Sequence, residues 1–112
     1  MSGPSAARRL RAQAPVFAAL GDQNRLALVA RLCDGAPRSI AQLSEGTKIT
    51  RQAITKHLKV LEEVGIVRSA REGRESRFTL EPAPLEEARS YLERVSAQWD
   101  QALARLKSFV EK

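Results

Sequence analysis

Residues 39–80, SIAQLSEGTKITRQAITKHLKVLEEVGIVRSAREGRESRFTL, decide the fold of this chain. Ser39 begins a short helix with a capping box, because Gln42 stands three positions further on. Residues 46–49 read Gly-Thr-Lys-Ile, which has the length and the glycine typical of the turn between two helices. Thr50 then caps a second helix, so the stretch begins with a helix, a tight turn and another helix.

The helix expected over residues 50–64 has two different faces. Ile54, Leu58 and Leu61 share the apolar face when residues are placed roughly 100° apart. The opposite face carries the types of side chain that bond base edges and phosphates, namely Gln52, Thr55, Lys56 and Lys59, with Arg51 in the first turn. A solvated polar face is the alternative, but these residues gather in the N-terminal half, which enters the DNA groove in helix-turn-helix proteins.

A β-hairpin is expected next, with strands over residues 66–72 and 75–80. Gly73 at the first central position of the turn favours a type II′ turn. Arginine recurs at every third position, as Arg68, Arg71, Arg74 and Arg77. That spacing places successive arginines on alternate faces of a strand. Arg74, in the turn, is suited to a narrow minor groove, whereas ion pairs with the flanking glutamates are the alternative role for these arginines.

The segment before residue 39 predicts a loose or weakly helical arm over residues 1–13 and two further helices. Pro15 suits the first turn of a short helix over residues 14–20, and Asp22 caps the next helix. The apolar stripe of that next helix consists of Leu26, Val29, Ala30 and Cys33, widened by Leu28 and Leu32. Cys33 on this stripe predicts a buried, unreactive thiol.

One long amphipathic helix is expected from residue 85 to the end of the chain. Its apolar residues alternate in steps of three and four, as in a coiled coil: Leu85, Ala88, Leu92, Val95, Trp99, Ala102, Leu106 and Phe109. A helix of about 25 residues spans nearly 40 Å, more than this small core can cover. We therefore expect a homodimer, although a helix folded back on its own domain is the alternative. The interface is expected to include Val16, Leu85, Leu92, Val95, Trp99, Leu103, Leu106 and Phe109.

The charge of the chain is uneven. The net charge is +6 over 112 residues, and residues 48–77 hold eight Lys/Arg and four Glu, a local charge of +4. Residues 78–112 hold five Lys/Arg and six acidic residues, a local charge of −1. The basic excess therefore lies on the helix and hairpin that would meet a polyanion. No apolar run reaches the roughly 20 residues of a membrane span, no secretory signal is expected at the start, and the single cysteine favours a cytoplasmic location.

These patterns predict a mainly α protein with a small β-hairpin, a winged helix-turn-helix of four helices, two strands and a last helix. The expected organisation is an arm over 1–13, a DNA-binding domain over 14–81 and a dimerisation helix over 82–112. The expected contacts to double-stranded DNA are Ser39, Thr50, Arg51, Gln52, Thr55, Lys56, Lys59, Arg71, Arg74 and Arg77. A protein-interaction module and a nonspecific nucleic-acid binder are the alternatives. No catalytic constellation or phosphate loop is present, so an enzyme is not expected.

Four segments resemble the ArsR/SmtB family of bacterial winged-helix repressors over residues 16–80. They are FAALGDQNRL at 17–26, SIAQL at 39–43, TRQAITKHLKVLEEVGIV at 50–67 and REGRESRFTL at 71–80. The resemblance implies a dimer built on the terminal helices. It also implies binding to operator DNA through the helix over 50–64 and the wing, usually in repression, and the two-fold symmetry of the expected dimer would match an inverted-repeat operator. It leaves the inducer unknown.

The chain departs from the metal-sensing members of that family. Ser39 and Ala41 occupy the positions of their Cys-x-Cys pair, and the last helix has no histidine. One cysteine and one histidine, Cys33 and His57, cannot supply the roughly four ligands of a tight transition-metal site. We therefore expect no metal and no cofactor, and we expect His57 to pack beside the apolar face of its helix.

Overall fold

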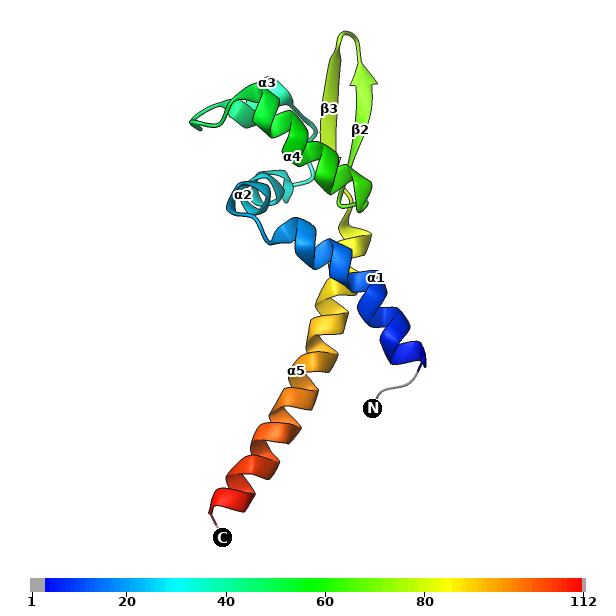
Figure 1. Ribbon diagram of the computed structural model, residues 1–112. Helices are drawn as coiled ribbons and strands as arrows, with labels where there is room; N and C mark the ends of the chain where they lie inside the picture. The colour runs from blue at the N-terminus through cyan, green and yellow to red at the C-terminus, as the bar shows by residue number, and fades with distance from the viewer. Residues whose placement is uncertain (1–3, 112) are drawn as a thin grey trace.

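A computed structural model describes residues 4–111, which form a mainly helical fold with a small antiparallel sheet (Figure 1). This confirms the predicted winged helix-turn-helix. The elements in chain order are α1 (Pro4–Leu20), α2 (Gln23–Leu32), β1 (Arg38–Ser39), α3 (Ile40–Ser44), α4 (Arg51–Glu63), β2 (Val67–Glu72), β3 (Glu75–Leu80) and α5 (Pro82–Val110).

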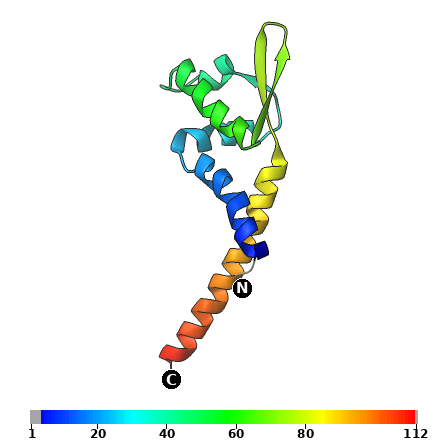
Figure 2. The same ribbon diagram turned by 45° about the vertical axis from the view of Figure 1, so that its right-hand side comes forward.

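The molecule is elongated, with extents of 66 × 30 × 22 Å. Helices α2, α3 and α4 and the hairpin form a compact head at one end (Figure 1). Helix α1 runs along the first part of α5, and both views show the rest of α5 continuing away from the head to the C-terminus (Figure 2). The helix-turn-helix and the free end of α5 therefore lie at opposite ends of the chain's long axis.

The core lies where α4 meets the surrounding helices and the sheet. Its fully buried side chains come from α2, α3, α4, the turn after α4 and the start of β2, and are Leu32, Leu43, Ile54, Leu58, Leu61, Ile66 and Val67. Phe78 of β3 and Ala88 of α5 close the same cluster. The apolar face predicted for α4 is thus the face that fixes this helix in the head, which leaves its polar face outward.

The predicted helix caps are present. Asp22 Oδ1 accepts from the backbone N–H groups of Asn24 (2.9 Å) and Arg25 (3.1 Å) at the start of α2. Ser39 and Gln42 form the expected capping box, and Thr50 Oγ1 accepts from the Ala53 N–H at 3.1 Å. Local hydrogen bonds therefore set where α2, α3 and α4 begin, because the first N–H groups of a helix have no partner within it.

The hairpin has the predicted turn and one more strand beside it. Gly73 has φ of 66°, and no non-glycine residue within 4–111 has a positive φ, so Arg74 fits a type II′ turn and not type I′. The two-residue strand β1 pairs with β3, which gives the order β1-β3-β2. The prediction missed β1 because two residues show no alternation.

The arm predicted over residues 1–13 as loose or weakly helical is a regular helix from residue 4 onward, so the loose alternative is wrong there; residues 1–3 lie outside the described part. Helix α1 already begins at Pro4 and continues through Pro15, which stands inside the helix and not in its first turn. Pro15 removes one helical hydrogen bond, but packing of α1 on α5 holds the helix together. Phe17 and Tyr91 form part of that packing, with ring centroids 6.2 Å apart.

The predicted burial is also wrong for three residues of the α2 stripe. Leu26 is 52% exposed and Ala30 is exposed too, whereas the buried side of α2 consists of Leu28, Val29 and Leu32. Cys33 is exposed, because α2 ends at Leu32 and Cys33 occupies the C-cap. The apolar stripe was therefore assigned about one position out of register with the true buried face.

Candidate nucleic-acid interface

The exposed face of α4 carries the side chains that the sequence singled out. Ile54, Leu58 and Leu61 hold the other side of the helix in the core, while the exposed set is Arg51, Gln52, Thr55, Lys56 and Lys59. Three of these, Gln52, Thr55 and Lys56, line one shallow depression of about 500 Å³. The predicted base-contacting residues therefore form one continuous surface on the N-terminal half of α4.

The threonine hydroxyls of this surface are already partly engaged. Thr55 Oγ1 donates to the Arg51 carbonyl at 2.8 Å, so the methyl group and an acceptor lone pair remain for a base. Thr50 Oγ1 accepts from Ala53 in the cap, which leaves its hydroxyl hydrogen free to donate to a phosphate oxygen. The remaining chemistry suits contact with a thymine methyl by Thr55 and contact with the backbone by Thr50.

The hairpin arginines separate into two faces. Cross-strand register places Arg71 opposite Ser76, on the face that also carries the buried Phe78. Arg68 and Arg77 lie on the other face, where Arg68 pairs with Glu81 at 2.9 Å and Arg77 with Glu72 at 3.3 Å and Glu75 at 3.6 Å. The expected DNA contact through Arg77 therefore competes with two ion pairs.

Arg71 and Arg74 are the two hairpin arginines that remain available. Both are exposed, and within residues 4–111 neither is part of an ion pair. Ser69 Oγ, on the same face as Arg71, donates to Glu62 Oε2 of α4 at 2.8 Å. The hairpin is thus tied to the C-terminal end of α4, with Arg71 on the side facing that helix and Arg74 at the tip.

Ser39 does not belong to this surface, which corrects one predicted contact. It is only 6% exposed, and its Oγ accepts from the Gln42 N–H at 3.2 Å within the capping box. Its role is to begin α3. The Ser39–Gln42 spacing predicted the cap correctly. Because Ser39 also belongs to the short strand β1, its side chain has no surface left for a ligand.

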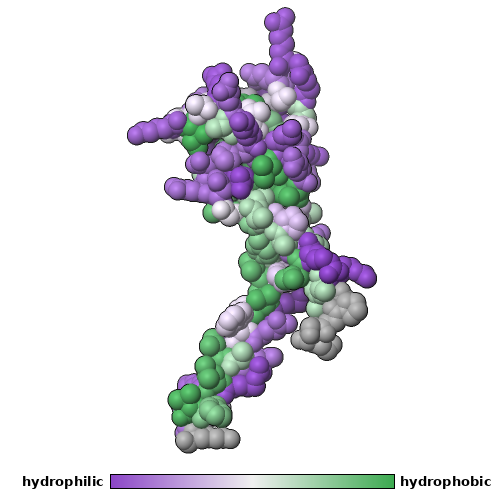
Figure 3. Space-filling view, viewed as in Figure 1, coloured by the Kyte–Doolittle hydropathy of each residue, from purple (hydrophilic) through white to green (hydrophobic). Residues whose placement is uncertain are grey.

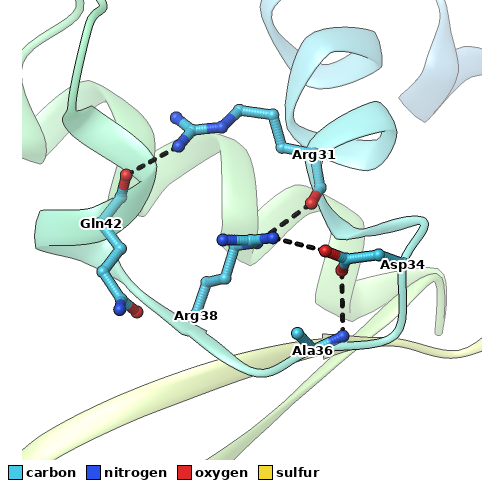
Figure 4. A network of polar contacts seen from close by, with 5 residues as sticks. All are labelled: Arg31, Asp34, Ala36, Arg38 and Gln42. Atoms are coloured by element: carbon cyan, nitrogen blue, oxygen red, sulfur yellow. Dashed lines mark hydrogen bonds and ion pairs between the residues drawn. The ribbon is translucent and has the colours of Figure 1, made fainter.

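Arg31 of α2 binds the C-terminal end of α3, a contact that was not predicted from the sequence. Arg31 donates to the carbonyl oxygen of Leu43 at 2.6 Å and to that of Gln42 at 2.9 Å, the second of which is drawn in Figure 4. Arg38 in turn donates to the Arg31 carbonyl at 3.1 Å and pairs with Asp34. A five-residue helix cannot hold its own position, so this network helps to hold α3 against α4.

The same network perturbs one carboxyl group. The Ala36 backbone N–H donates to Asp34 Oδ1 at 3.0 Å, and with the Arg38 guanidinium it lowers the pKa of the Asp34 carboxyl below its ordinary value. Asp34 therefore stays ionised, and paired with Arg38, at a lower pH than an ordinary aspartate would.

A second arginine connects α1 with α4. Arg25 donates from Nε to the Ala19 carbonyl and from Nη2 to the Ala18 carbonyl, at the C-terminal end of α1. Its Nη1 lies 3.4 Å from Nδ1 of His57, which is half-buried in α4. His57 is therefore a packing residue beside the apolar face, as expected, and Arg25 joins the two helices through it.

The far half of α5 is apolar and uncovered in the protomer. Figure 3 shows hydrophobic residues along the helix as it leaves the head, and the exposed ones are Leu92, Trp99, Leu103, Leu106, Phe109 and Val110. The alternative in which α5 folds back on its own domain is therefore wrong. Val16, at 7% exposure, and the half-buried Leu85 pack in the protomer core, so they offer little surface to a partner.

Two other kinds of site have no candidate in the part of the chain that the structure describes. Within residues 4–111 there is no group of three or more His, Cys, Asp or Glu placed to hold a metal ion. None of the helices in this part of the chain combines the length and hydropathy that crossing a membrane requires.

Known proteins are similar to this chain in both sequence and fold. Residues 20–70 match a helix-turn-helix domain family. The HTH-type transcriptional regulator Rv2034 of Mycobacterium tuberculosis is 34% identical over 85 residues, 76% of each chain. An ArsR-like transcriptional regulator from Rhodococcus sp. RHA1 has 39% identity and a TM-score of 0.73, covering 88% of this chain and 92% of that one. The transcriptional repressor BigR from Xylella fastidiosa has 26% identity and a TM-score of 0.64, with coverages of 80% and 88%.

These relatives are transcriptional regulators and not enzymes, and they extend over most of the chain. The matched segment holds the helix-turn-helix whose α4 presents the polar surface described above. The chain belongs to the ArsR family of DNA-binding, helix-turn-helix transcriptional regulators.

Proposed function

We propose that this regulator is a repressor that binds an inverted-repeat operator as a homodimer and does so without a metal signal. The observation that carries the proposal is the division of surfaces along one protomer. A basic and polar surface on α4 and the hairpin lies at one end, and an uncovered apolar seam on α5 lies toward the other. The first surface suits DNA and the second suits another copy of the chain.

The DNA surface has separate parts for reading bases and for holding phosphates. Gln52 and Thr55 are suited to base edges in the major groove, because glutamine bonds adenine and the threonine methyl contacts thymine. Lys56, Lys59 and Arg51 border them and are suited to phosphates or guanine. Arg74, at the hairpin tip, is suited to the minor groove beside the site. We infer that α4 reads the major groove while the hairpin grips the adjacent backbone.

A two-fold dimer supports an inverted-repeat operator. An isologous dimer presents the same α4 twice with opposite orientation, so each half-site repeats the other in reverse. The seam needed for such a dimer consists of Leu92, Val95, Trp99, Leu103, Leu106 and Phe109 on α5. Repression is supported by the structural similarity to BigR, which is itself a transcriptional repressor.

Cell-free transcription tests the repressor role. A promoter carrying an operator selected by the protein is transcribed with increasing concentrations of the dimer, and a promoter with a scrambled operator is the matched control. We expect transcription to fall only from the promoter with the intact operator. A rise in transcription from that promoter would identify an activator. Equal transcription from both promoters would mean that the protein binds this operator without repressing transcription, which would contradict the repressor role.

A further inference from the structure

An open groove runs between α1 and α5, away from the surface proposed to meet DNA. Its volume is about 500 Å³, within the range of small-molecule sites. Its charged and amide-bearing lining residues are Arg8, Arg9 and Gln13 of α1 and Glu86, Glu87 and Arg94 of α5. Ala12 and Ser90 complete the wall. The two helices meet here without filling the space between them.

Gln13 gives the groove an unmet hydrogen-bonding requirement. It is only 9% exposed, and its Oε1 has no hydrogen-bond partner among the described residues. A buried carbonyl oxygen without a donor costs roughly what a lost hydrogen bond costs, so such atoms are rare in folded proteins. Rotation of this amide toward the groove would let an occupant with an N–H or O–H group satisfy it.

The charges of the lining favour an anion. Three arginines and two glutamates give a net charge of +1. Glu86 already accepts from Arg89 at 2.9 Å, so part of the negative charge is neutralised outside the groove. Within residues 4–111, Arg8, Arg9 and Arg94 are in no ion pair, and arginine is the side chain best suited to bind a carboxylate bidentately.

The groove stays clear of the apolar seam. At roughly 100° per residue, the groove residues of α5 are centred about 150° from the seam that contains Leu92 and Trp99. On α5, a second copy seated on the seam therefore leaves the groove side of the helix uncovered. This position separates the groove from the proposed dimer contact along the same helix.

We propose that this groove is an effector site for a small organic anion that carries a hydroxyl or amine donor. The carboxylate pairs with the arginines, and the donor bonds Gln13 Oε1. The regulatory part of this proposal rests on the proposed repressor function, whereas binding to the groove does not.

The structure contains a contact route from the groove to α4. Gln13 lies on α1, whose C-terminal carbonyls at Ala18 and Ala19 accept from Arg25. Arg25 then meets His57 of α4. An occupant that shifts α1 against α5 therefore acts on the end of α1 that Arg25 holds, and through His57 on the helix that reads DNA. A ligand changes operator affinity only by its difference in affinity for the two arrangements.

The binding test uses 4-hydroxybenzoate as the probe, on the full-length dimer without DNA. Its carboxylate and hydroxyl group match the two requirements of the groove. Benzoate lacks the donor, and 4-hydroxybenzyl alcohol lacks the charge. We expect nuclear magnetic resonance titrations to show saturable shifts at residues of α1 and α5, strongest for 4-hydroxybenzoate. No saturable shift up to tens of millimolar, or shifts confined to other surfaces, would overturn the site.

Variants separate the two contacts. Gln13→Leu replaces the unmet amide with an apolar group of similar size, so it keeps the fold. It is expected to weaken 4-hydroxybenzoate binding about threefold to tenfold and leave benzoate unchanged. Arg94→Gln is expected to weaken both carboxylates. Arg105→Gln, an exposed α5 arginine outside the groove, is the matched control and is expected to change neither. Equal weakening of both probes by Gln13→Leu would refute the donor contact.

The regulatory arm measures operator affinity with and without saturating 4-hydroxybenzoate. We expect the probe to change the affinity of the unmodified dimer and to have a smaller effect on Gln13→Leu at the same concentration. A probe that occupies the groove without changing operator affinity would overturn the effector role alone. Failure of the probe-free dimer to bind any operator would instead contradict the proposed function, so the two failures are distinguishable.

Discussion

Replacing Trp99 with alanine tests whether the seam of α5 forms the dimer. Trp99 is 64% exposed in the protomer, and a tryptophan offers up to about 250 Å² of side-chain surface, so about 160 Å² is available to a partner. At about 25 cal/mol per Å², complete covering would contribute about 4 kcal/mol. A seam that covers half of this surface contributes about 2 kcal/mol per protomer.

Two-fold symmetry doubles that loss, because the substitution removes the same contact from both protomers. Trp99→Ala is therefore expected to raise the dimer dissociation constant about a thousandfold. The protomer itself should keep its fold and thermal stability, since so much of the side chain lies outside the core. Operator affinity should fall together with dimerisation.

Sedimentation equilibrium over a range of protein concentrations measures the dissociation constant directly. Leu26→Ala is the matched control, because Leu26 is a similarly exposed apolar residue, 52%, on α2. The control is expected to leave dimerisation unchanged. An unchanged dissociation constant for Trp99→Ala would place this residue outside the interface and remove the main support for dimerisation through α5.

Three further substitutions test the DNA surface, the support of α3 and a helix cap. Gln52→Ala should relax base preference at one position of each half-site by about 1–3 kcal/mol, measured by competition among operator variants; an equal loss for every sequence would contradict base reading. Arg31→Ala should lower the free energy of unfolding by about 1–3 kcal/mol, measured by denaturant titration, because carbonyls at the end of α3 lose a charged donor; full recovery with Arg31→Lys would argue against the bridging geometry. The Arg25 backbone N–H lowers the pKa of the Asp22 carboxyl below its ordinary value of 3.8. The Asp22 carboxylate therefore stabilises the folded state fully above pH 3.8, and this stabilisation is lost as the pH falls through the lower pKa of the folded state. Thermal melts of Asp22→Asn, which keeps a capping side chain without titrating, should lack this component of acid sensitivity; identical acid profiles would contradict it.

The parts of the fold set by local chemistry were predictable from the sequence. The caps at Asp22, Ser39 and Thr50 each need only a side chain and an N–H group two or three residues away, so they appear in sequence spacing. The apolar face of α4 and the type II′ turn at Gly73 are equally local. These signals position α4 and the hairpin, and with them most of the predicted DNA surface.

The parts that failed depend on partners distant in the chain. Helix α1 is stabilised by α5, which follows about 60 residues later, and contacts such as Phe17 with Tyr91 leave no local period. Arg31 acts on backbone carbonyls, which every residue has, so no motif marks its target. Burial of Ser39 likewise follows from pairing of β1 with β3, and no spacing around Ser39 reveals it.

Selection from a library of inverted-repeat DNA by the purified dimer, at two salt concentrations, tests sequence-specific operator binding most directly. We predict enrichment of one two-fold sequence. Affinity should fall steeply as salt rises, by a slope of about 0.9 for each phosphate that a lysine or arginine neutralises. Strong salt dependence with no enriched sequence would instead identify a nonspecific nucleic-acid binder. Absence of binding at both salt concentrations would contradict an operator-binding role. The fold would then be interpreted as a protein-interaction module.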